Sequence, residues 1–532
     1  MAPIARGEDL AAAQPGWQIE ELLQPAAYLH AVTRLELHET HTSWVILTGS
    51  LAYKIKKPVK FPFLDASSLE KRQHYCQEEL RLNRRLAPEI YLDVVAITRT
   101  DGRICMGGAG PAIEYAVRMQ QFAPDSELTS LLARGAVSVS DAVALGELLA
   151  GFHLSAPVAP WTGTDEKTRQ MYQTVLGNLG ELVAHLERPQ PLPGLSRLVD
   201  WSHDNARSLQ TTFELRERSG FIRECHGDLH AANIVRSAQR LVPFDCLEFD
   251  PQLRWIDTIN DIAFLVMDLE SYQRNDLAFA LLSRYLEISG DYDGVRLLPF
   301  YAVYRALVRA KVDALTAEQL PQRAAEFHGR LLRRIRTAIR WMDAQRPTLI
   351  LMHGASGSGK SWLSERLVAA LPAVRIRSDL ERKRLARVGT HAGAAKFRQG
   401  IYAPGFTHRT YARLSDCAES CLRAGFNVVV DAAFLDPSDR ELFRGLATRL
   451  RVPCVIVSCQ ADRATLAVRV QERRRDREDP SDADQAVLDA QLRNMQPFAA
   501  QELSRVVAVQ TTEPDVAARV TASIRSLCEL DG

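Results

Sequence analysis

Residues 349–361, LILMHGASGSGKS, are an apolar run followed by a glycine-rich loop, and a helical pattern (WLSERLVAAL) continues to residue 371. The loop matches G-x-x-x-x-G-K-[ST] between a strand and a helix, which is the context that a phosphate-binding loop requires. Its backbone N–H groups and the positive end of the helix attract phosphate oxygens. We expect Lys360 to neutralise β- and γ-phosphate charge and Ser361 to bind Mg²⁺. The predicted nucleotide-binding residues are Gly354, Ala355, Ser356, Gly357, Ser358, Gly359, Lys360 and Ser361.

Short apolar runs and helical stretches alternate through the second half of the chain. This alternation is typical of repeated βαβ units and a parallel sheet. The predicted strands are Leu349–Met352, Val374–Ile376, Val428–Val430, Cys454–Val457 and Val506–Val509. We therefore predict an α/β domain over residues 346–532, joined to the first half at Arg346-Pro347.

Two carboxylates follow strands of this predicted sheet. Asp379 comes after the second strand, where a carboxylate can take a proton from an attacking hydroxyl. Arg382 lies on the same face of the following helix and could contact phosphate or substrate. Asp379 could also cap that helix. Asp431 ends the third strand and is a predicted partner of Mg²⁺ or its waters.

An arginine cluster follows the fourth predicted strand. Residues 463–477 contain six arginines, and Arg469 and Arg473 lie four residues apart on one helical face. Such a cluster could close over transferred phosphates as a lid. It could instead be a solvated basic helix, or it could face nucleic acid.

The first half contains a second phosphate-transfer motif, HGDLHAAN at residues 226–233, followed by LVPFDCLEF at residues 241–249. Asp228 and Asn233 are five residues apart, and Asp245 follows Asn233 by twelve. These spacings fit the kinase catalytic loop H-R-D-x-x-x-x-N and the later D-F-G aspartate. In that chemistry one carboxylate takes the proton of a substrate hydroxyl, while an amide and a second carboxylate hold Mg²⁺ on ATP. A polar turn without metal is the alternative.

This segment resembles aminoglycoside phosphotransferases and related small-molecule kinases, whose loop reads H-G-D. The resemblance implies an α+β bilobal protein-kinase-like fold over residues 1–345, with an N-lobe at about 1–120 and a C-lobe at about 121–345. It implies that Asp228 is the catalytic base and that Asn233 and Asp245 bind Mg²⁺. It further implies that His226 shapes the loop and that Asp261 is the buried aspartate that supports it.

The N-lobe of such a fold contains a lysine–glutamate pair. Residues 52–54, AYK, resemble the A-x-K of the third kinase strand, so Lys54 is the predicted lysine. Lys56 shares its strand face and is the second candidate. Glu79 in the next helix is the predicted partner, and Glu78 is the second candidate. Each could instead be a solvent-facing charge.

Two further N-lobe features concern the nucleotide. Met119 begins an apparent hinge, extending to Phe122, whose backbone would bind adenine. No G-x-G-x-x-G precedes the A-x-K lysine. Residues 40–43 or 48–50 would therefore have to cover the phosphates.

The second half also resembles a known group, over roughly residues 347–515. It is similar to the kinase half of phage-type polynucleotide kinases and to zeta-toxin and gluconate-kinase-like domains. The resemblance implies that Asp379 is a base, that Arg382 contacts substrate or phosphate, and that Arg469 and Arg473 belong to a lid. The whole chain resembles the bacterial fusion described as a bifunctional aminoglycoside-phosphotransferase-like and ATP-binding (AAA_33-type) protein.

Composition limits the partners and the compartment. Lys and Arg number 66 against 65 Asp and Glu, and the net charge of +1 gives no reason to expect bulk-charge binding to nucleic acid or membrane. No apolar run approaches the ~18 residues of a membrane span, and the N-terminal residues lack a basic-then-apolar signal pattern. The nine cysteines form no C-x-x-C pair, which favours reduced thiols in the cytoplasm.

The leading hypothesis is two ATP–Mg²⁺ kinase domains in one chain. The first transfers the γ-phosphate to a hydroxyl of a small polar metabolite or sugar, and acceptor-binding residues are expected within 125–215 and 265–340. The second phosphorylates a small molecule or a nucleic-acid 5′-hydroxyl. One alternative makes the second half an ATP-driven switch. Another makes the protein a nucleic-acid repair kinase, although nucleic acid is not favoured as a partner.

Overall fold

A computed structural model of the chain describes residues 16–61, 64–186, 194–343, 346–387, 403–475 and 484–529. Packing divides the chain into two compact units. The first unit contains Met1–Val137, Phe152–Tyr272 and Phe300–Arg340, and the second contains Ser138–Gly151, Gln273–Pro299 and Trp341–Gly532. The protein is therefore multidomain.

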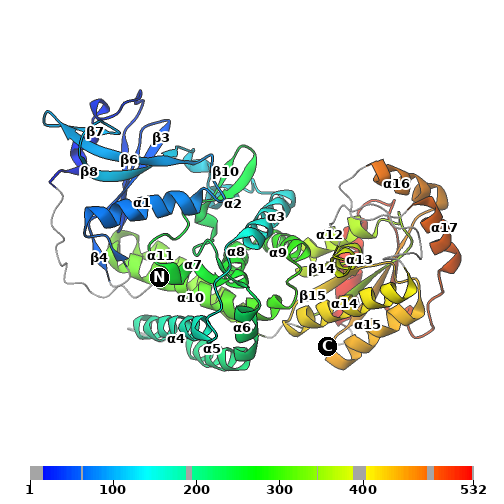
Figure 1. Cartoon of the computed structure of the whole chain (residues 1–532). Helices are drawn as coiled ribbons and strands as arrows, with labels where there is room; N and C mark the ends of the chain where they lie inside the picture. The colour runs from blue at the N-terminus through cyan, green and yellow to red at the C-terminus, as the bar shows by residue number, and fades with distance from the viewer. Residues whose placement is uncertain are drawn as a thin grey trace. The chain divides into compact units, whose positions relative to one another are not determined.

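The N-terminal part of the first unit is a six-stranded antiparallel sheet with one long helix on it (Figure 1). The strand order is β1-β2-β3-β8-β6-β7. The strands are β1 (Glu36–Glu39), β2 (Ser43–Leu47), β3 (Leu51–Lys56), β6 (Tyr91–Thr100), β7 (Arg103–Met106) and β8 (Ala112–Gln120), and a small hairpin of β4 (Lys60–Phe61) and β5 (Leu64–Asp65) follows β3. Helix α1 (Leu69–Asn83) begins at Ser68, whose hydroxyl caps it by accepting a hydrogen bond from the Lys71 N–H.

The rest of the first unit is mainly helical. Its helices are α2 (Leu128–Ala133), α4 (Glu166–Leu186), α5 (Leu195–Ser208), α6 (Gln210–Arg218), α7 (Pro251–Arg254), α8 (Thr258–Ser271), and most of α10 (Leu298–Gln319) and α11 (Ala324–Met342). Two short antiparallel pairs lie among them: β9 (Ile222–Glu224) with β12 (Trp255–Asp257), and β10 (Ile234–Ser237) with β11 (Arg240–Pro243). This sheet-plus-helix architecture confirms the predicted α+β bilobal class.

The second unit is built on a five-stranded parallel sheet in the order β14-β15-β13-β16-β17. The strands are β13 (Leu349–His353), β14 (Ala373–Arg377), β15 (Asn427–Asp431), β16 (Cys454–Gln460) and β17 (Val506–Gln510). Its helices include α12 (Lys360–Ala370), α13 (Ser378–Leu385), α14 (Pro404–Arg423), α15 (Pro437–Leu450), α16 (Arg463–Arg475), α17 (Gln485–Asn494) and α18 (Val516–Glu529). Each strand coincides with a predicted apolar run, so the predicted α/β class is confirmed.

Two segments from earlier in the chain also belong to the second unit. They contain most of α3 (Val139–Ser155) and all of α9 (Asn275–Ser289). Helix α9 packs against α12 and against β14, the strand at the edge of the parallel sheet. The boundary predicted between residues 345 and 346 stays a prediction, because the second unit combines residues from both sides of it.

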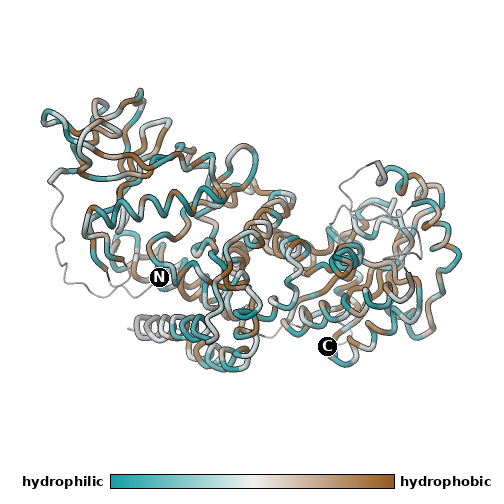
Figure 2. The backbone as a smooth tube through the Cα atoms, in the orientation of Figure 1, coloured by the Kyte–Doolittle hydropathy of each residue, from teal (hydrophilic) through white to brown (hydrophobic). Residues whose placement is uncertain are grey.

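Hydropathy along the chain follows this packing (Figure 2). Helix α1 is mostly hydrophilic, yet it buries Glu79 completely. The parallel strands contribute Ile350, Val429 and Val457 to an apolar core shared with α12 and α18. Within the described ranges, no helix combines the length and apolar character needed to cross a membrane.

Candidate active sites

The first candidate site surrounds the loop between β9 and β10. The Asn233 side-chain Nδ2 donates to the backbone oxygen of Asp228 at 3.0 Å and to its Oδ2 at 3.1 Å. His230 Nε2 lies 3.4 Å from the same Oδ2. Burial tends to raise the pKa of Asp228, but His230 and the charge of Arg309 outweigh it and hold that pKa well below its usual range. Asp228 is therefore an ionised carboxylate at neutral pH, which is the state a general base requires.

The carboxylate of Asp261, in α8, binds the backbone of this loop. It accepts hydrogen bonds from the backbone N–H groups of His226, at 2.9 Å, and Gly227, at 3.0 Å, and His153 Nε2 lies 3.1 Å away. Gly227 has a φ of 88°, and a Cβ there would lie 2.9 Å from the Leu253 carbonyl oxygen, so the turn requires glycine. His226 Nε2 reaches the Phe244 carbonyl oxygen at 2.9 Å. The loop shape is thus held by the two residues that the resemblance assigns to it.

The β10–β11 hairpin brings the two predicted metal ligands together. The Phe244 N–H donates to the Asn233 carbonyl oxygen at 2.9 Å, which places Asp245 beside Asn233. Asp245 has a φ of 61°, which is rare for a residue with a side chain, and its N–H donates to the Tyr91 hydroxyl at 3.1 Å. Asn233 donates through its amide nitrogen and so keeps its side-chain oxygen as an acceptor. An amide oxygen beside a carboxylate is a donor set that suits Mg²⁺.

The lysine–glutamate pair is formed in the N-lobe. Lys54 Nζ lies 2.8 Å from Glu79 Oε1 and 2.5 Å from Asp245 Oδ1. Lys56 Nζ lies 2.5 Å from Glu79 Oε2 and also pairs with Glu248. Burial opposes ionisation of Glu79, but the two lysines outweigh it and lower the pKa of Glu79 to about 2. The structure brings together Lys54, Glu79 and Asp245, and it makes Lys56 a second partner of the same glutamate.

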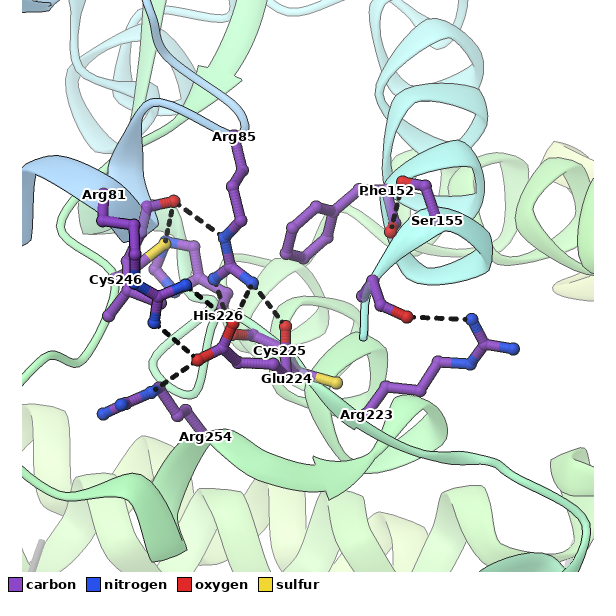
Figure 3. Close-up of polar contacts among 12 residues, drawn as sticks. Arg81, Arg85, Phe152, Ser155, Arg223, Glu224, Cys225, His226, Cys246 and Arg254 are labelled. Carbon is purple, nitrogen blue, oxygen red and sulfur yellow. Dashed lines mark hydrogen bonds and ion pairs between the residues drawn. The ribbon is translucent and has the colours of Figure 1, made fainter. Parts of the chain in front are cut away.

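A buried glutamate that the sequence analysis missed connects α1 to the predicted catalytic loop, residues 226–233 (Figure 3). Glu224 lies at the end of β9. Its Oε1 accepts a hydrogen bond from Arg81 Nη2 at 2.7 Å. Arg85 Nη1 donates to the Glu224 backbone oxygen at 2.7 Å, and Arg254 Nε lies 3.3 Å from Oε1. Since α1 carries Glu79 and β9 runs directly into the catalytic loop, these contacts hold the two parts of the site together.

The predicted adenine region is apolar. Met119 lies in β8 opposite Ala52 and Tyr91. Its side chain packs in a cluster with Val117 and Val235. The residues predicted to cover the phosphates form turns, 40–43 between β1 and β2 and 48–50 between β2 and β3. Binding of adenine by the Met119 backbone stays a prediction.

The second candidate site is the loop between β13 and α12. Gly357 has a φ of 82°, and a Cβ there would lie 2.7 Å from the Leu466 carbonyl oxygen. Lys360 Nζ folds back onto the loop and donates to the carbonyl oxygens of Gly354, at 2.8 Å, and Ala355, at 2.9 Å. The loop therefore has the curled backbone that its glycines predict, and the lysine points into it.

Asp431 lies beside this loop. It ends β15 in register with Met352 of β13, and its Oδ2 accepts a hydrogen bond from Ser364 Oγ at 3.4 Å. Ser364 stands about one helical turn after Ser361 on α12, so the predicted hydroxyl and carboxylate ligands lie close to each other. Both supply oxygen, as Mg²⁺ prefers.

The remaining predicted residues are placed as follows. Asp379 lies in the first turn of α13, but Arg377 occupies the cap position, so the structure corrects the alternative in which Asp379 caps the helix. Arg382 Nη1 donates to Thr407 Oγ1 of α14 at 3.1 Å. Arg469 Nη1 donates to the Gly357 carbonyl oxygen at 3.3 Å, at the loop itself. The backbone of Arg473 belongs to α16, while its side chain lies outside the described residues.

Several other residues of the two sites carried no readable signal in the sequence. Arg309 Nη1 lies 2.9 Å from His230 Nε2, and burial together with the Arg309 charge lowers the pKa of His230. Thr511 Oγ1 donates to the Ser358 carbonyl oxygen at 2.9 Å and accepts from Arg469 at 2.9 Å. Glu224, two residues before His226, and Glu248, three residues after Asp245, lie close enough in the sequence to a motif to have been suspected.

A family model and several solved structures match parts of this chain. Residues 349–498 match the AAA domain model AAA_33. A gluconokinase from Sinorhizobium meliloti is 21% identical, covering 35% of this chain and 95% of that one with a TM-score of 0.27. A choline/ethanolamine kinase family protein from Mesorhizobium loti is 15% identical, covering 58% of this chain and 88% of that one with a TM-score of 0.35.

Relatives that match over most of the chain are found among curated mycobacterial proteins. Rv2004c and MT2060 from Mycobacterium tuberculosis and Mb2027c from Mycobacterium bovis are described as uncharacterized proteins. Each is 31% identical to this chain over 438 residues, which is 82% of this chain and 86% of the relative. The protein therefore belongs to the same family as these mycobacterial proteins, and residues 349–498 of it match the AAA_33 domain model.

Proposed function

We propose that the first unit is an ATP-dependent phosphotransferase that transfers the γ-phosphoryl group to a hydroxyl of a small polar molecule. The observation that carries the proposal is the convergence of Lys54, Asp245 and the Asp228–Asn233 pair in one unit. The ionised Asp228 accepts the proton of the acceptor hydroxyl as that oxygen attacks phosphorus. Lys54, held by Glu79, neutralises phosphate charge. Mg²⁺ held by Asn233 and Asp245 would supply further charge neutralisation.

A cavity in the same unit supports a small acceptor. It opens to solvent, and it is lined by residues of α4, β12, α8 and α10. Arg305 lines it and donates to the Gly227 carbonyl oxygen at 3.2 Å, one residue before Asp228. The lining contains aromatic rings (Trp255, Tyr301, Tyr304) beside polar side chains (Lys167, Gln170, Gln252, Asn260). Flat apolar faces next to amide and cationic donors suit a hydroxylated ring such as a sugar.

For the second unit we propose a P-loop kinase that uses ATP and Mg²⁺. Its acceptor would be a small molecule or a nucleic-acid 5′-hydroxyl, with Asp379 as base and Arg382 as a substrate contact. The position of Arg469 at the loop supports a contribution to phosphate binding. The alternatives are an ATP-driven switch that regulates the first unit and a nucleic-acid repair kinase. The net charge of +1 makes nucleic acid the less favoured partner.

We also propose a cytoplasmic location. All nine cysteines carry free thiols, and most are buried. Reduced thiols are the rule in the cytoplasm.

The test is transfer of labelled γ-phosphate from ATP–Mg²⁺ into a bacterial metabolite extract supplemented with short oligonucleotides. Wild type, Asp228→Asn, Lys360→Ala and the double variant are compared. We expect two sets of labelled products, each lost with one variant only, because each variant removes a charge needed at one site. Release of free phosphate alone, dependent on Lys360, would support the switch and refute the second kinase.

A further inference from the structure

We propose that the ion pair between Glu287 and Arg375 positions the Mg²⁺ ligands of the P-loop site. A segment that lies more than 50 residues before the loop thereby contributes to metal binding at the loop. This inference rests on the proposed nucleotide binding by that loop. Glu287 and Arg375 act as positioning residues and do not touch nucleotide. All of the groups involved belong to the second unit.

The ion pair is buried. Arg375 Nε lies 2.6 Å from Glu287 Oε1, and the side chains are 11% and 0% exposed respectively. Glu287 belongs to α9 and Arg375 to the edge strand β14. A buried charge is tolerated only when it is paired, so each residue determines the position of the other.

The other end of the Arg375 guanidinium reaches the P-loop helix. Its Nη1 donates to the Ser361 carbonyl oxygen at 3.3 Å and to Ser364 Oγ at 3.4 Å. Ser364 Oγ in turn donates to Asp431 Oδ2 at 3.4 Å. Polar contacts therefore run from Glu287 through Arg375 to the backbone of Ser361 and to the Ser364 hydroxyl. That hydroxyl lies 3.0 Å from the Ser361 carbonyl oxygen and 3.4 Å from Asp431 Oδ2, so it links the backbone of one predicted Mg²⁺ ligand to the carboxylate of the other.

The backbone of Arg375 is held by the same segment. Its N–H donates to Ser283 Oγ at 2.9 Å, and its carbonyl oxygen accepts from the Tyr292 hydroxyl at 3.1 Å. Strand β14 pairs with β15 on one side only, so these two side chains satisfy backbone groups on its open side. Both Ser283 and Tyr292 are buried. The segment around α9 thus fixes Arg375 at its backbone and at its side chain.

Further contacts anchor this segment independently of Glu287's side chain. Arg384 Nη2 donates to the Glu287 backbone oxygen at 2.8 Å, near the end of α9. Ser420 Oγ donates to Asp293 Oδ1 at 2.7 Å. A change of the Glu287 side chain therefore leaves these attachments of the segment in place.

The consequence concerns metal binding more than nucleotide binding. Without the Glu287 charge, the Arg375 guanidinium is left buried, and Asp431 is the next carboxylate on its contact path. A guanidinium paired with Asp431 competes with Mg²⁺ for that carboxylate. Loss of an outer-shell partner of a metal ligand typically weakens metal binding by roughly 10- to 100-fold. Because Arg375 and Ser364 lie between Glu287 and Asp431, we expect the loss of Glu287 to act toward the lower end of that range.

The experiment uses the full chain carrying Asp245→Asn, which removes a predicted metal ligand of the first site. Binding of a fluorescent ATP analogue is titrated against Mg²⁺ in this background. We expect Glu287→Gln to raise the Mg²⁺ concentration for half-maximal binding by roughly 10-fold, the lower end of that range. Asp276→Asn is the matched control, because Asp276 pairs with Arg274 at 2.7 Å in the first turn of the same helix, eleven residues before Glu287. We expect the control to behave like the background chain.

A second variant covers the case in which Glu287→Gln does not fold. Arg375→Lys keeps the buried charge but loses the forked contacts to Ser361 and Ser364, so we expect the same direction of shift. Unchanged Mg²⁺ dependence in either folded variant, even with a lower melting temperature, overturns the proposal and leaves the nucleotide site intact. Absence of nucleotide binding in the background chain, or binding insensitive to Lys360→Ala, overturns both the proposal and the proposed function of the loop.

Discussion

Two adjacent glutamates in α1 have opposite surroundings. Glu79 is completely buried between Lys54 and Lys56. Glu78 is partly exposed and pairs with Arg81 at 2.9 Å on the helix surface. A carboxylate buried between two lysines is shielded from water, whereas a surface ion pair competes with solvent.

We therefore predict that Glu79→Gln lowers the free energy of unfolding of the first unit by about 1.5–3 kcal/mol at pH 7, because each of two buried lysines loses one of its two carboxylate partners and keeps only Asp245 or Glu248. Glu78→Gln is the matched control and should cost about 1 kcal/mol or less. Calorimetric unfolding of the full chain, following the transition of the first unit, measures both. Equal losses for the two variants would show that Glu79 has no special contribution.

The same residue predicts a pH dependence. The pKa of Glu79 is lowered from 4.5 to about 2, so its ionisation stabilises the folded state above pH 4.5 and this stabilisation is lost as pH falls toward 2. The stability difference between wild type and Glu79→Gln should shrink across that window. Melting temperatures of wild type and Glu79→Gln, measured between pH 5 and pH 2, test whether the difference shrinks as the pH falls. A difference that stays constant would contradict the ionisation of Glu79 in the folded state.

At the scale of elements, α1 and β9 are joined by Glu224. Arg81 belongs to α1 and Arg85 lies just after its end, while Arg254 contacts the same carboxylate from α7. Helix α1 carries the glutamate that orients Lys54, while β9 leads into the loop with Asp228. The two halves of the phosphate-transfer site are thus connected through one buried side chain.

We predict that Glu224→Gln loosens this connection. Loss of about 1.5 kcal/mol, as for one hydrogen bond to a charged group, corresponds to roughly tenfold faster opening. Hydrogen exchange of the α1 and β9 amides should therefore speed up about tenfold, while exchange in the parallel sheet stays the same. Glu89→Gln, which removes an ion pair to Arg240 on the surface of the same unit, is the control. Unaltered exchange in α1 would mean that other contacts hold it.

At the scale of the whole molecule, the second unit is not one continuous stretch of chain. Residues 138–151 and 273–299 pack with residues 341–532. The earlier segment includes Ser283 and Tyr292, which satisfy the backbone of Arg375 on the open side of β14. An edge strand without such cover is a site for pairing with other chains.

A chain limited to residues 346–532 should therefore be less stable than the second unit of the full protein, and it should self-associate through β14. Size-exclusion chromatography and thermal melting of this fragment beside the full chain provide the test. Adding residues 273–299 in trans as a peptide should restore part of the melting temperature. A monomeric fragment that melts with the second unit of the full chain would contradict this prediction.

The sequence by itself determined the local structure and the two motifs. The apolar runs became the five parallel strands, the loop at 354–361 lies between a strand and a helix, and Asp228, Asn233 and Asp245 lie together. Apolar periodicity and motif spacing act within a few residues, so they can be recognised without knowledge of the rest of the chain.

Only the tertiary structure decided which distant charges meet. From the sequence, Lys56 is the second candidate for the role of Lys54. In the structure both lysines bind Glu79. Glu224 and Glu287 belong to no motif, and the side chains that they bind are distant in the sequence. Periodicity shows that a position is buried, but it carries no information about its partner. Partners are selected when burial makes an unpaired charge too costly, and that happens only once segments far apart in the chain pack together.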